Sequence, residues 1–300
     1  MTWRSGGVAL VAVLWGVLLL AVLAAGVTAL VRTENARAGL DLDRAKLQTL
    51  VDSARVLIVQ RLFDPKPERR PPLDGSSIPL EWDGETVNVA LTLESGRIDL
   101  NAASDELVAA VGEAAGLDSR QSNAWVAKLR DWQDADDARR QDGAESAEYR
   151  SLGTRYGPRN APLKSIRELQ LLLGMTDELY RCLAGSTTVY TESPAPDVAR
   201  LTPLAAVALA KLEKSVPGTS PGAAAATAAI PNVGPIDVSG QVIRMEVTVA
   251  RPDGVRRSII VGRLSGRADQ AWITLDQWGQ LDERECTATK TEQRTEPARR

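Results

Sequence analysis

The sequence predicts an α+β fold in which a long N-terminal helix packs on an antiparallel sheet that carries a large inserted α-helical domain. Three observations support this prediction. An uncharged apolar run begins close to the N-terminus. The apolar positions that follow it recur every three or four residues, as on one face of a helix. Two segments with strand-like alternation then flank a long central stretch of helical pattern.

The apolar run extends from Val8 to Val31 and contains no charged residue. As a helix it would measure about 36 Å, enough to cross a hydrocarbon core of about 30 Å. It exceeds the h-region of a secretory signal, roughly 7 to 15 residues, and continues directly into Arg32. We therefore expect a retained membrane anchor. Its short head, with Arg4, predicts a cytoplasmic N-terminus and a body on the other side of the membrane.

The helix should continue well beyond the membrane segment. Apolar side chains recur there on one face, at Leu40, Leu47, Leu50, Val51, Ala54, Leu57, Ile58 and Leu62. No proline interrupts the pattern before Asp64-Pro65. A single helix is thus predicted from Val8 to Phe63, with its second half packed under the globular body.

Strand patterns lie on both sides of the central helical stretch. After a proline-rich loop, "TVNVALTL" alternates apolar and polar residues and precedes "ESG" and "RIDL", which predicts a β-hairpin. Nearer the C-terminus, residues 243 to 249 alternate, a turn follows at "RPDG", and "SIIVGRL" and "AWITL" predict two more strands.

Between these strands the pattern is helical from Asn101 to about Leu183. Asn101 or Ser104 is a candidate start for the first of these helices. Ser165, with a glutamate three residues later, forms a capping box before "IRELQLLLGM". A further helix is expected from Pro203 to Leu212. The low-complexity residues 215–235 should form a loop, and residues 283–300 a disordered tail.

Composition argues against an enzyme. The chain contains no histidine, so the commonest general base and metal ligand is missing. It also lacks a Gly-x-Ser-x-Gly elbow, a Walker loop and a cysteine-rich metal set. Cys182 and Cys286 are the only thiols. They could pair in an oxidising compartment, and the sequence leaves this open.

The densest acidic segment is "DWQDADDARRQDGAE", between two predicted helices. Its candidate metal ligands are Asp131, Asp134, Asp136, Asp137, Asp142 and Glu145. Hard oxygen ligands at this density suit Ca²⁺, although their spacing differs from that of an EF-hand. The alternative is a solvated acidic loop neutralised by Arg139 and Arg140, and the residues alone do not decide between the two readings.

Two segments, "GRIDLNAASDELVAAV" and "SIRELQLLLGMTDELY", resemble helix-hairpin-helix modules that bind the DNA backbone. In such modules a glycine hairpin and basic side chains face phosphate. Here Gly174 is followed by Met175, Thr176, Asp177 and Glu178, whose acidic members repel phosphate. We therefore expect a helical domain of this shape that binds no nucleic acid. A membrane-anchored DNA-binding protein of the competence type is the alternative.

The chain as a whole resembles the K-type minor pseudopilins of type II secretion systems, the general secretion pathway protein K family. The likeness rests on a short leader ending in glycine, a retained hydrophobic segment and a long N-terminal helix. It rests further on "GRIDLNAAS", "DWQDADD", "YGPRNAPLKSIRELQLLLGM" and "TVYTES", in that order. It covers the chain to about residue 280, apart from residues 215–235.

The resemblance implies a pilin-like fold with an inserted domain of SAM-like or helix-hairpin-helix-like shape. Prepilin peptidase would cut after Gly7 and leave Val8 as the new, usually N-methylated, terminus. The implied parts are a leader at 1–7, a transmembrane segment at 8–31, pilin-like helix and hairpin at 32–97, the insertion at 98–214, the loop at 215–235, the C-terminal sheet at 236–282 and the tail at 283–300.

The resemblance also implies a role without catalysis. The family member joins the I-type and J-type minor pseudopilins at the pseudopilus tip and helps to start assembly for export across the outer membrane. Further implied partners are other pseudopilins, the inner-membrane secretion platform, prepilin peptidase and membrane lipid. The protein would cross the bacterial inner membrane once, with a cytoplasmic N-terminus and a periplasmic body.

Two sites gain meaning from the resemblance. The family's acidic loop binds calcium, which favours Ca²⁺ as a cofactor here. Major pilins carry a glutamate at the fifth mature position, where it neutralises the N-terminal amine of the preceding subunit. Counting from Val8, this chain has Ala12 at that position. A subunit with no neighbour above it has no such amine to meet, so Ala12 is consistent with a tip position.

Overall fold

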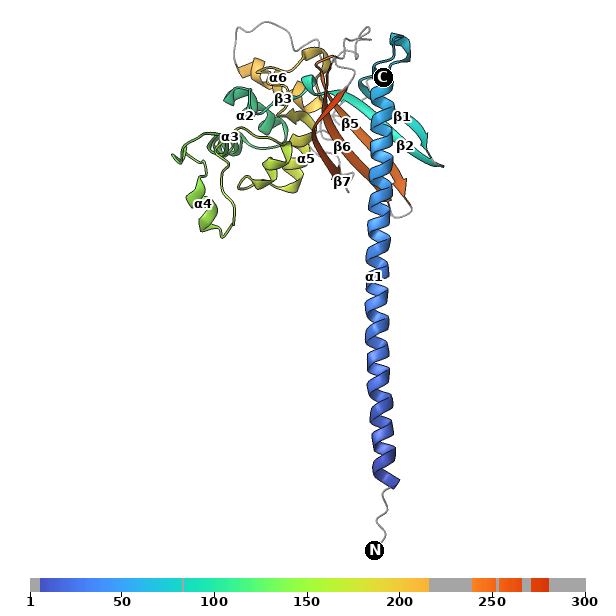
Figure 1. Ribbon diagram of the computed structural model, residues 1–300. Helices are drawn as coiled ribbons and strands as arrows, with labels where there is room; N and C mark the ends of the chain where they lie inside the picture. The colour runs from blue at the N-terminus through green and yellow to red at the C-terminus, as the bar shows by residue number, and fades with distance from the viewer. Residues whose placement is uncertain (1–5, 83, 216–238, 252–253, 266–270, 281–300) are drawn as a thin grey trace, which may run out of the picture. The chain divides into compact units, whose positions relative to one another are not determined.

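The computed structural model describes residues 6–82, 84–215, 239–251, 254–265 and 271–280 (Figure 1). The chain divides into two compact units, Met1–Ser53 and Ala54–Arg300. The loop predicted at 215–235, apart from Ser215, and the tail predicted at 283–300 lie outside the described residues. Cys286 does as well. Cys182 is disulfide-bonded.

Helix α1 (Gly6–Leu62) makes up the described part of the first unit and continues into the second. It is unbroken, as the sequence predicts, and its ends agree with the predicted ones to within two residues. From Leu10 to Val31 its large apolar side chains are exposed. Over its most apolar 18-residue stretch the mean hydropathy is 2.7, so the helix is long and apolar enough to cross a membrane.

A five-stranded sheet forms the core of the second unit, with strand order β1-β2-β5-β6-β7. Every neighbouring pair is antiparallel. Its strands are β1 (Asp74–Trp82), β2 (Glu85–Leu93), β5 (Val242–Arg251), β6 (Gly254–Leu264) and β7 (Trp272–Gln280). Since β2 and β5 are hydrogen-bonded neighbours, everything between them in sequence is an insertion into the sheet.

One face of this sheet packs against the last turns of α1. Ala54, Ile58 and Leu62 recur every four residues on the helix and are buried, which is the spacing of a single helical face. On the same face Arg55 donates a hydrogen bond to Thr274 of β7, 3.3 Å away. This part of the stripe predicted from the sequence is therefore buried.

The opposite face of the sheet carries the inserted helices. Val242, Ile259 and Val261 of β5 and β6 belong to one hydrophobic cluster with the helical residues of the insertion. Central strand β5 is consequently covered on both faces over its first half. Arg244, on the face that carries the insertion, is therefore buried as well.

The insertion consists of short helices closed by a small parallel sheet. Its α-helices are α2 (Asp105–Ala114), α3 (Ser119–Gln133), α4 (Ser146–Ser151), α5 (Asp177–Ser186) and α6 (Pro203–Ser215). The 3₁₀ turns of the chain are η1 (Pro67–Arg69), η2 (Glu94–Gly96), η3 (Ile166–Leu171) and η4 (Val198–Arg200). Strands β3 (Ile98–Asp99) and β4 (Thr187–Thr188) pair in parallel and bring the two ends of the helical stretch together.

The predicted hairpin of "TVNVALTL" with "RIDL" is wrong in its partner. The "TVNVALTL" strand, β2, pairs instead with β1, which precedes it in sequence. "ESG" forms the 3₁₀ turn η2, and Ile98–Asp99 leaves the main sheet to pair with β4. The alternation of apolar and polar residues identified the strands correctly. It does not say which other strand each of them pairs with.

Capping residues mark several helix starts as expected. Ser104, one of the two candidates, is the N-cap of α2 and accepts a hydrogen bond from the Leu107 amide. Ser165 and Glu168 form the predicted capping box. The segment that follows is the 3₁₀ helix η3 and not an α-helix.

Candidate metal site

The acidic segment connects α3 to α4 and turns back on itself. Asp131 lies in the last turn of α3, Asp134 is the C-cap of that helix, and Glu145 is the N-cap of α4. Between them a turn reverses the chain, in which the Gly143 amide donates to the Arg140 carbonyl at 3.0 Å. This reversal brings the end of α3 next to the start of α4.

Three of the six predicted ligands meet in what we call the carboxylate cluster, formed by Asp131, Asp134 and Glu145. One carboxylate oxygen from each lies within 4.8 Å of the others. The remaining three, Asp136, Asp137 and Asp142, are exposed on the loop. Asp142 occupies the turn with a φ of 60°, a left-handed conformation that aspartate tolerates better than most residues.

Glu145 is the unusual member of the carboxylate cluster. It is buried, with 3% relative exposure. Its side chain faces the Glu148 amide in a capping-box arrangement, but neither of its carboxylate oxygens, nor Oδ1 of Asp134, has a hydrogen-bond partner of normal geometry among the described residues. Burial, together with the charges of Asp131 and Asp134, raises the pKa of Glu145 to about 7. A buried carboxylate without a partner is costly, so this position would suit a cation.

Arg140 supplies the positive charge that the cluster does have. Its Nη1 donates to Oδ1 of Asp131 at 3.0 Å, and the same nitrogen also donates to Asp134. These bonds raise the pKa of Arg140. Its backbone amide donates to Oδ2 of Asp131 at 3.2 Å. One guanidinium thus faces three carboxylates, and Glu145 is the one that it does not bind.

The donor set fits a hard divalent cation. Carboxylate oxygens from three separate chain positions converge, and one of them is buried and unpartnered. Ca²⁺ takes six to eight oxygen ligands from carboxylates, backbone carbonyls and water. Asp131, Asp134 and Glu145 would hold such an ion.

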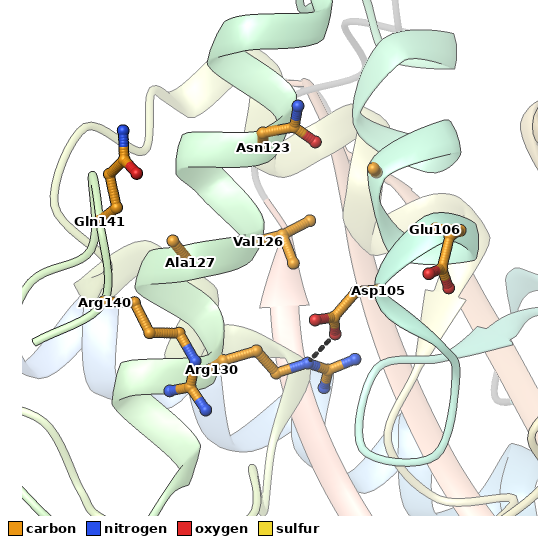
Figure 2. A pocket seen from close by; sticks show the side chains of 9 residues that line it. Asp105, Glu106, Asn123, Val126, Ala127, Arg130, Arg140 and Gln141 are labelled. Carbon is orange, nitrogen blue, oxygen red and sulfur yellow. Dashed lines mark hydrogen bonds and ion pairs between the residues drawn. The ribbon is translucent and has the colours of Figure 1, made fainter. Parts of the chain in front are cut away.

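A cavity of about 410 Å³ lies beside the cluster, between α2 and α3 (Figure 2). Ala109, Val126 and Ala127 contribute its apolar lining. Arg140 borders it on the side of the acidic loop. Arg130 also borders it and is held in place by Asp105, with Nε 2.6 Å from Oδ1.

Sequence reasoning assigned no role to Asp99, although "GRIDL" contains it. Asp99 is 1% exposed. Its Oδ2 accepts hydrogen bonds from the Thr191 amide at 2.9 Å and the Glu192 amide at 2.8 Å. Those two residues belong to "TVYTES". One carboxylate therefore joins two motifs that are far apart in the sequence. The acidic residue in "GRIDL" and the hydroxyl residues in "TVYTES" are the sequence features from which this contact could have been suspected.

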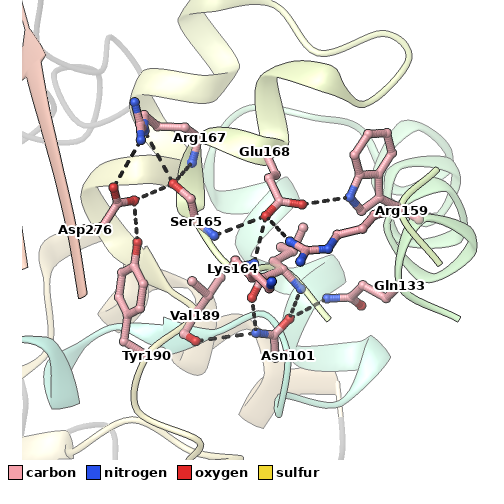
Figure 3. A network of polar contacts seen from close by, with 12 residues as sticks. Asn101, Gln133, Arg159, Lys164, Ser165, Arg167, Glu168, Val189, Tyr190 and Asp276 are labelled. Atoms are coloured by element: carbon pink, nitrogen blue, oxygen red, sulfur yellow. Dashed lines mark hydrogen bonds and ion pairs between the residues drawn. The ribbon is translucent and has the colours of Figure 1, made fainter. Parts of the chain in front are cut away.

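Asn101 has a similar joining role, shown in Figure 3. Its amide nitrogen donates to the Leu163 carbonyl, and its amide oxygen accepts from the Leu163 amide, both at 2.9 Å. Gln133 of α3 donates to the same oxygen at 2.9 Å. Asn101 was a candidate helix start in the sequence, but in the structure its half-buried side chain joins three segments of the insertion.

Strand β7 binds the insertion through Asp276 (Figure 3). Val261 pairs with Asp276 while Gly262 pairs with Thr274, so Leu275 has no partner and forms a bulge. Such a bulge reorients the side chains that follow it. Asp276 consequently faces the insertion. There its Oδ2 accepts from the Tyr190 hydroxyl at 2.7 Å, and it also binds Ser165 and Arg167.

A second junction is a buried charge group formed by Glu94, Arg97 and Arg244. Glu94 is fully buried, and its Oε1 lies 2.6 Å from Nε of Arg244 and 3.5 Å from Nη1 of Arg97. Burial alone would raise the pKa of Glu94, but the two arginines hold it below its ordinary value. Arg244 also donates to the Ala184 carbonyl of α5 at 2.8 Å.

Known proteins resemble this chain both in the sequence of the inserted region and in the fold. Residues 88–192 match the family model described as type II secretion system (T2SS), protein K. No curated protein sequence matches the chain. The fold is similar to that of a chain in the GspK-GspI-GspJ complex from the type 2 secretion system of enterotoxigenic Escherichia coli. The TM-score is 0.59 at 16% identity, over 83% of this chain and 100% of that chain.

At 16% identity this likeness concerns the fold, and the family match concerns residues 88–192. That range begins in β2 and ends just after β4, and it contains the carboxylate cluster, Asp99 and Asn101. The resemblance to the K-type minor pseudopilins is therefore borne out over residues 88–192, which match the type II secretion system protein K family model.

Proposed function

We propose that this protein caps the tip of a type II secretion pseudopilus and promotes its assembly for protein export across the outer membrane. The observation that carries the proposal is the match of residues 88–192 to the protein K family model. That match favours a minor pseudopilin over the DNA-binding alternative. The α-helical insertion between β2 and β5 adds bulk that suits an end position better than a repeated one.

The partners follow from the same comparison. The solved complex contains GspK, GspI and GspJ, so the I-type and J-type minor pseudopilins are the proposed neighbours of this chain. Helix α1 would anchor the protein in the bacterial inner membrane with a periplasmic body. There it would meet membrane lipid, other pseudopilins and the secretion platform. Cleavage after Gly7 by prepilin peptidase would free Val8 as the methylated terminus.

Ala12 supports the tip position. A glutamate there would need the amine of a neighbouring subunit as its partner. An unpaired intramembrane carboxylate costs on the order of 2.5 to 3.5 kcal/mol. An apolar residue avoids this cost in a subunit that has no neighbour above it.

Calcium binding at the carboxylate cluster is the second part of the proposal. The buried, unpartnered oxygens of Glu145 support it most directly. A bound ion would stabilise the segment from α3 to α4, because it would join the end of one helix to the start of the next. Extracytoplasmic calcium sites need affinities of only about 10⁻⁴ to 10⁻³ M.

The proposed role is tested by co-expression of the full chain with its I-type and J-type partners in membranes. We expect an affinity tag on this chain to retain both partners after detergent extraction. The fifth-position glutamate variant, Ala12→Glu, should give no gain in assembly. Recovery of this chain without either partner, in extracts where the partners bind each other, would contradict the proposal.

The calcium site is tested by thermal unfolding of the full chain in detergent. Addition of EDTA should lower the melting temperature, and calcium should restore it. Asp134→Ala and Glu145→Gln should each abolish this difference, whereas Glu68→Gln, at an exposed carboxylate in η1, should keep it. A melting temperature that does not respond to EDTA would return the loop to a solvated acidic surface.

A further inference from the structure

We propose that the guanidinium of Arg140 occupies the place of the calcium ion in the metal-free protein and must leave it when the ion binds. Arg140 would then set the calcium affinity by competition and keep the empty loop folded. The inference rests on the calcium site proposed above. It concerns what the protein does when calcium is absent.

The first step is the position of the guanidinium. Nη1 of Arg140 binds both Asp131 and Asp134, which supply two of the three oxygens of the carboxylate cluster. A guanidinium is always charged and offers only donors. It can therefore neither coordinate a cation nor tolerate one a few ångströms away. A cation ligated by both aspartates would exclude Nη1 from its present place.

The second step is the incomplete charge balance that Arg140 leaves behind. Asp131 is fully buried and Glu145 is 3% exposed. Arg140 binds Asp131 but not Glu145, whose two oxygens accept no hydrogen bond of normal geometry. The single positive charge of Arg140 thus neutralises only part of the negative charge of the carboxylate cluster. A divalent ion that also reaches Glu145 would neutralise more of the negative charge than the guanidinium does.

The third step is a route by which the side chain can leave. The Arg140 side chain is 46% exposed, while that of Asp131 is fully buried. Arg140 also borders the cavity of about 410 Å³ next to the loop, where Asp105 and Glu106 offer negative charge (Figure 2). The guanidinium can therefore move into water or toward these carboxylates without opening the core.

The backbone of Arg140 does not need to move with its side chain. Its amide donates to the carboxylate of Asp131, and its carbonyl accepts from the Gly143 amide at 3.0 Å. Both bonds fix the turn independently of the guanidinium. Exchange of arginine for calcium would thus change one side chain and leave the path of the loop intact.

Arg139 provides a matched control in the neighbouring position. It is 53% exposed, and its Nε lies 3.4 Å from Glu148, which is outside the carboxylate cluster. Removing the charge of Arg139 changes the net charge of the loop by the same amount as removing that of Arg140. A difference between the two variants therefore reports on the contacts of Arg140 and not on overall charge.

The experiment compares calcium affinity in the full-length protein, Arg140→Gln and Arg139→Gln by isothermal titration in detergent. We expect Arg140→Gln to bind calcium about tenfold or more tightly than the unaltered protein, since its competitor is gone. In EDTA the same variant should melt at a lower temperature. Arg139→Gln should change neither quantity appreciably.

A second measurement on the unaltered protein covers the case in which Arg140→Gln fails to fold. Modification of arginines by phenylglyoxal, followed by mass spectrometry, should increase several-fold at Arg140 when calcium replaces EDTA. The reactivity of Arg139 should stay constant.

The outcomes separate this inference from the calcium site itself. Equal or weaker calcium binding by Arg140→Gln, or unchanged reactivity of Arg140 on calcium addition, would overturn the competition while the site stands. Failure of both the unaltered protein and Arg140→Gln to bind calcium would overturn the site and the inference together.

Discussion

The carboxylate of Asp131 is enclosed so tightly that one neighbouring position has room only for glycine. A Cβ on Gly143 would overlap Oδ2 of Asp131 and lie 2.8 Å from its Cγ. The carboxylate cannot retreat, because Asp131 is fully buried and bound to the amide of Arg140. Gly143 therefore determines how closely the returning loop approaches the end of α3.

We predict that Gly143→Ala lowers the free energy of unfolding by about 1 to 3 kcal/mol, the usual cost of overpacking. Because the clash displaces Asp131, calcium affinity should fall as well. Chemical denaturation and calcium titration measure the two effects. Gly185→Ala in α5 is the control, since a Cβ there meets open space. Equal effects of both substitutions would contradict this role for Gly143.

Glu145 should make the metal-free protein sensitive to pH. Its pKa is about 7 in the folded state, above its ordinary value of 4.5. Below pH 4.5 the group is protonated in both the folded and unfolded states, so it costs nothing. Between pH 4.5 and 7 the unfolded state ionises while the folded state keeps the proton, so about 3 kcal/mol of stability should be lost over this range, and the loss is complete above pH 7.

Urea unfolding in EDTA at pH 5 and pH 8 measures this loss. The chain has no histidine to titrate in the same range. Glu145→Gln should flatten the profile, and saturating calcium should do the same, because the bound ion favours the ionised carboxylate. A profile of the Glu145→Gln variant as steep as that of the unaltered protein would show that another group is responsible.

At this scale the sequence located the acidic segment but could not say which of its members meet. Asp134 and Asp136 both follow Asp131 within five residues, and spacing alone does not say which of them meets it. Their fates differ because α3 ends at Gln133 and the turn at Asp142 reverses the loop onto Asp134. The unpartnered state of Glu145 depends on burial by residues distant in the sequence, so it required the structure.

At the scale of elements, polar junctions join the inserted helices to the sheet. Glu94 precedes the insertion, Arg244 follows it in β5, and their contact lies at the point where the insertion leaves the sheet. Trp278 of β7 packs its ring 5.7 Å from the guanidinium of Arg244. A buried charge of this kind is costly to leave unpaired.

We predict that Glu94→Gln destabilises the protein by about 3 to 5 kcal/mol, because it removes the buried counter-charge that Arg97 and Arg244 share. Chemical denaturation of the full chain in detergent measures the change. Asp197→Asn breaks a more exposed pair with Arg200 and should cost under about 1 kcal/mol. If both variants lost a similar free energy of unfolding, burial of the Glu94 group would not increase its contribution to stability.

The sequence predicted those elements whose marking residues lie within the element or next to it. The start of α2 at Ser104 and the capping box at Ser165 lie within a few residues of the features that mark them, and both were identified. The pairing of β2 with β1, and of β3 with β4, depends on which edges meet in space. The bulge at Leu275 that aims Asp276 at the insertion is likewise determined by the neighbouring strand.

At the scale of the whole molecule, the chain combines two parts. One is an apolar helix long enough to cross a membrane, and the other is an antiparallel sheet with a helical insertion. Composition and periodicity predicted both parts. The inserted domain also carries the family match. The processing of the N-terminus remains a prediction that rests on the resemblance.

We predict that co-expression with prepilin peptidase shortens the protein by the leader 1–7, and that Gly7→Glu prevents this. A bulky charged side chain directly before the cleaved bond should block access of the peptidase. Intact mass and N-terminal sequencing measure the product, with Gly6→Ala as a control that keeps Gly7. A mature protein that still begins with Met1 would contradict the leader assignment.

The pairing of β2 with β5 has a consequence for how the chain acquires its structure. Glu94 and Arg244 are 150 residues apart in the sequence, yet their strands are neighbours in the sheet. Closing an unstructured loop costs entropy that grows only slowly with length, about 0.6 kcal/mol per doubling. Contacts between residues this far apart in sequence nevertheless slow folding, as in other proteins of high contact order. Within the insertion, α2 packs against α6 from its other end, and the pairing of β3 with β4 also brings its two ends together. If the insertion folds first, it would bring β5 close to β2 before the sheet forms.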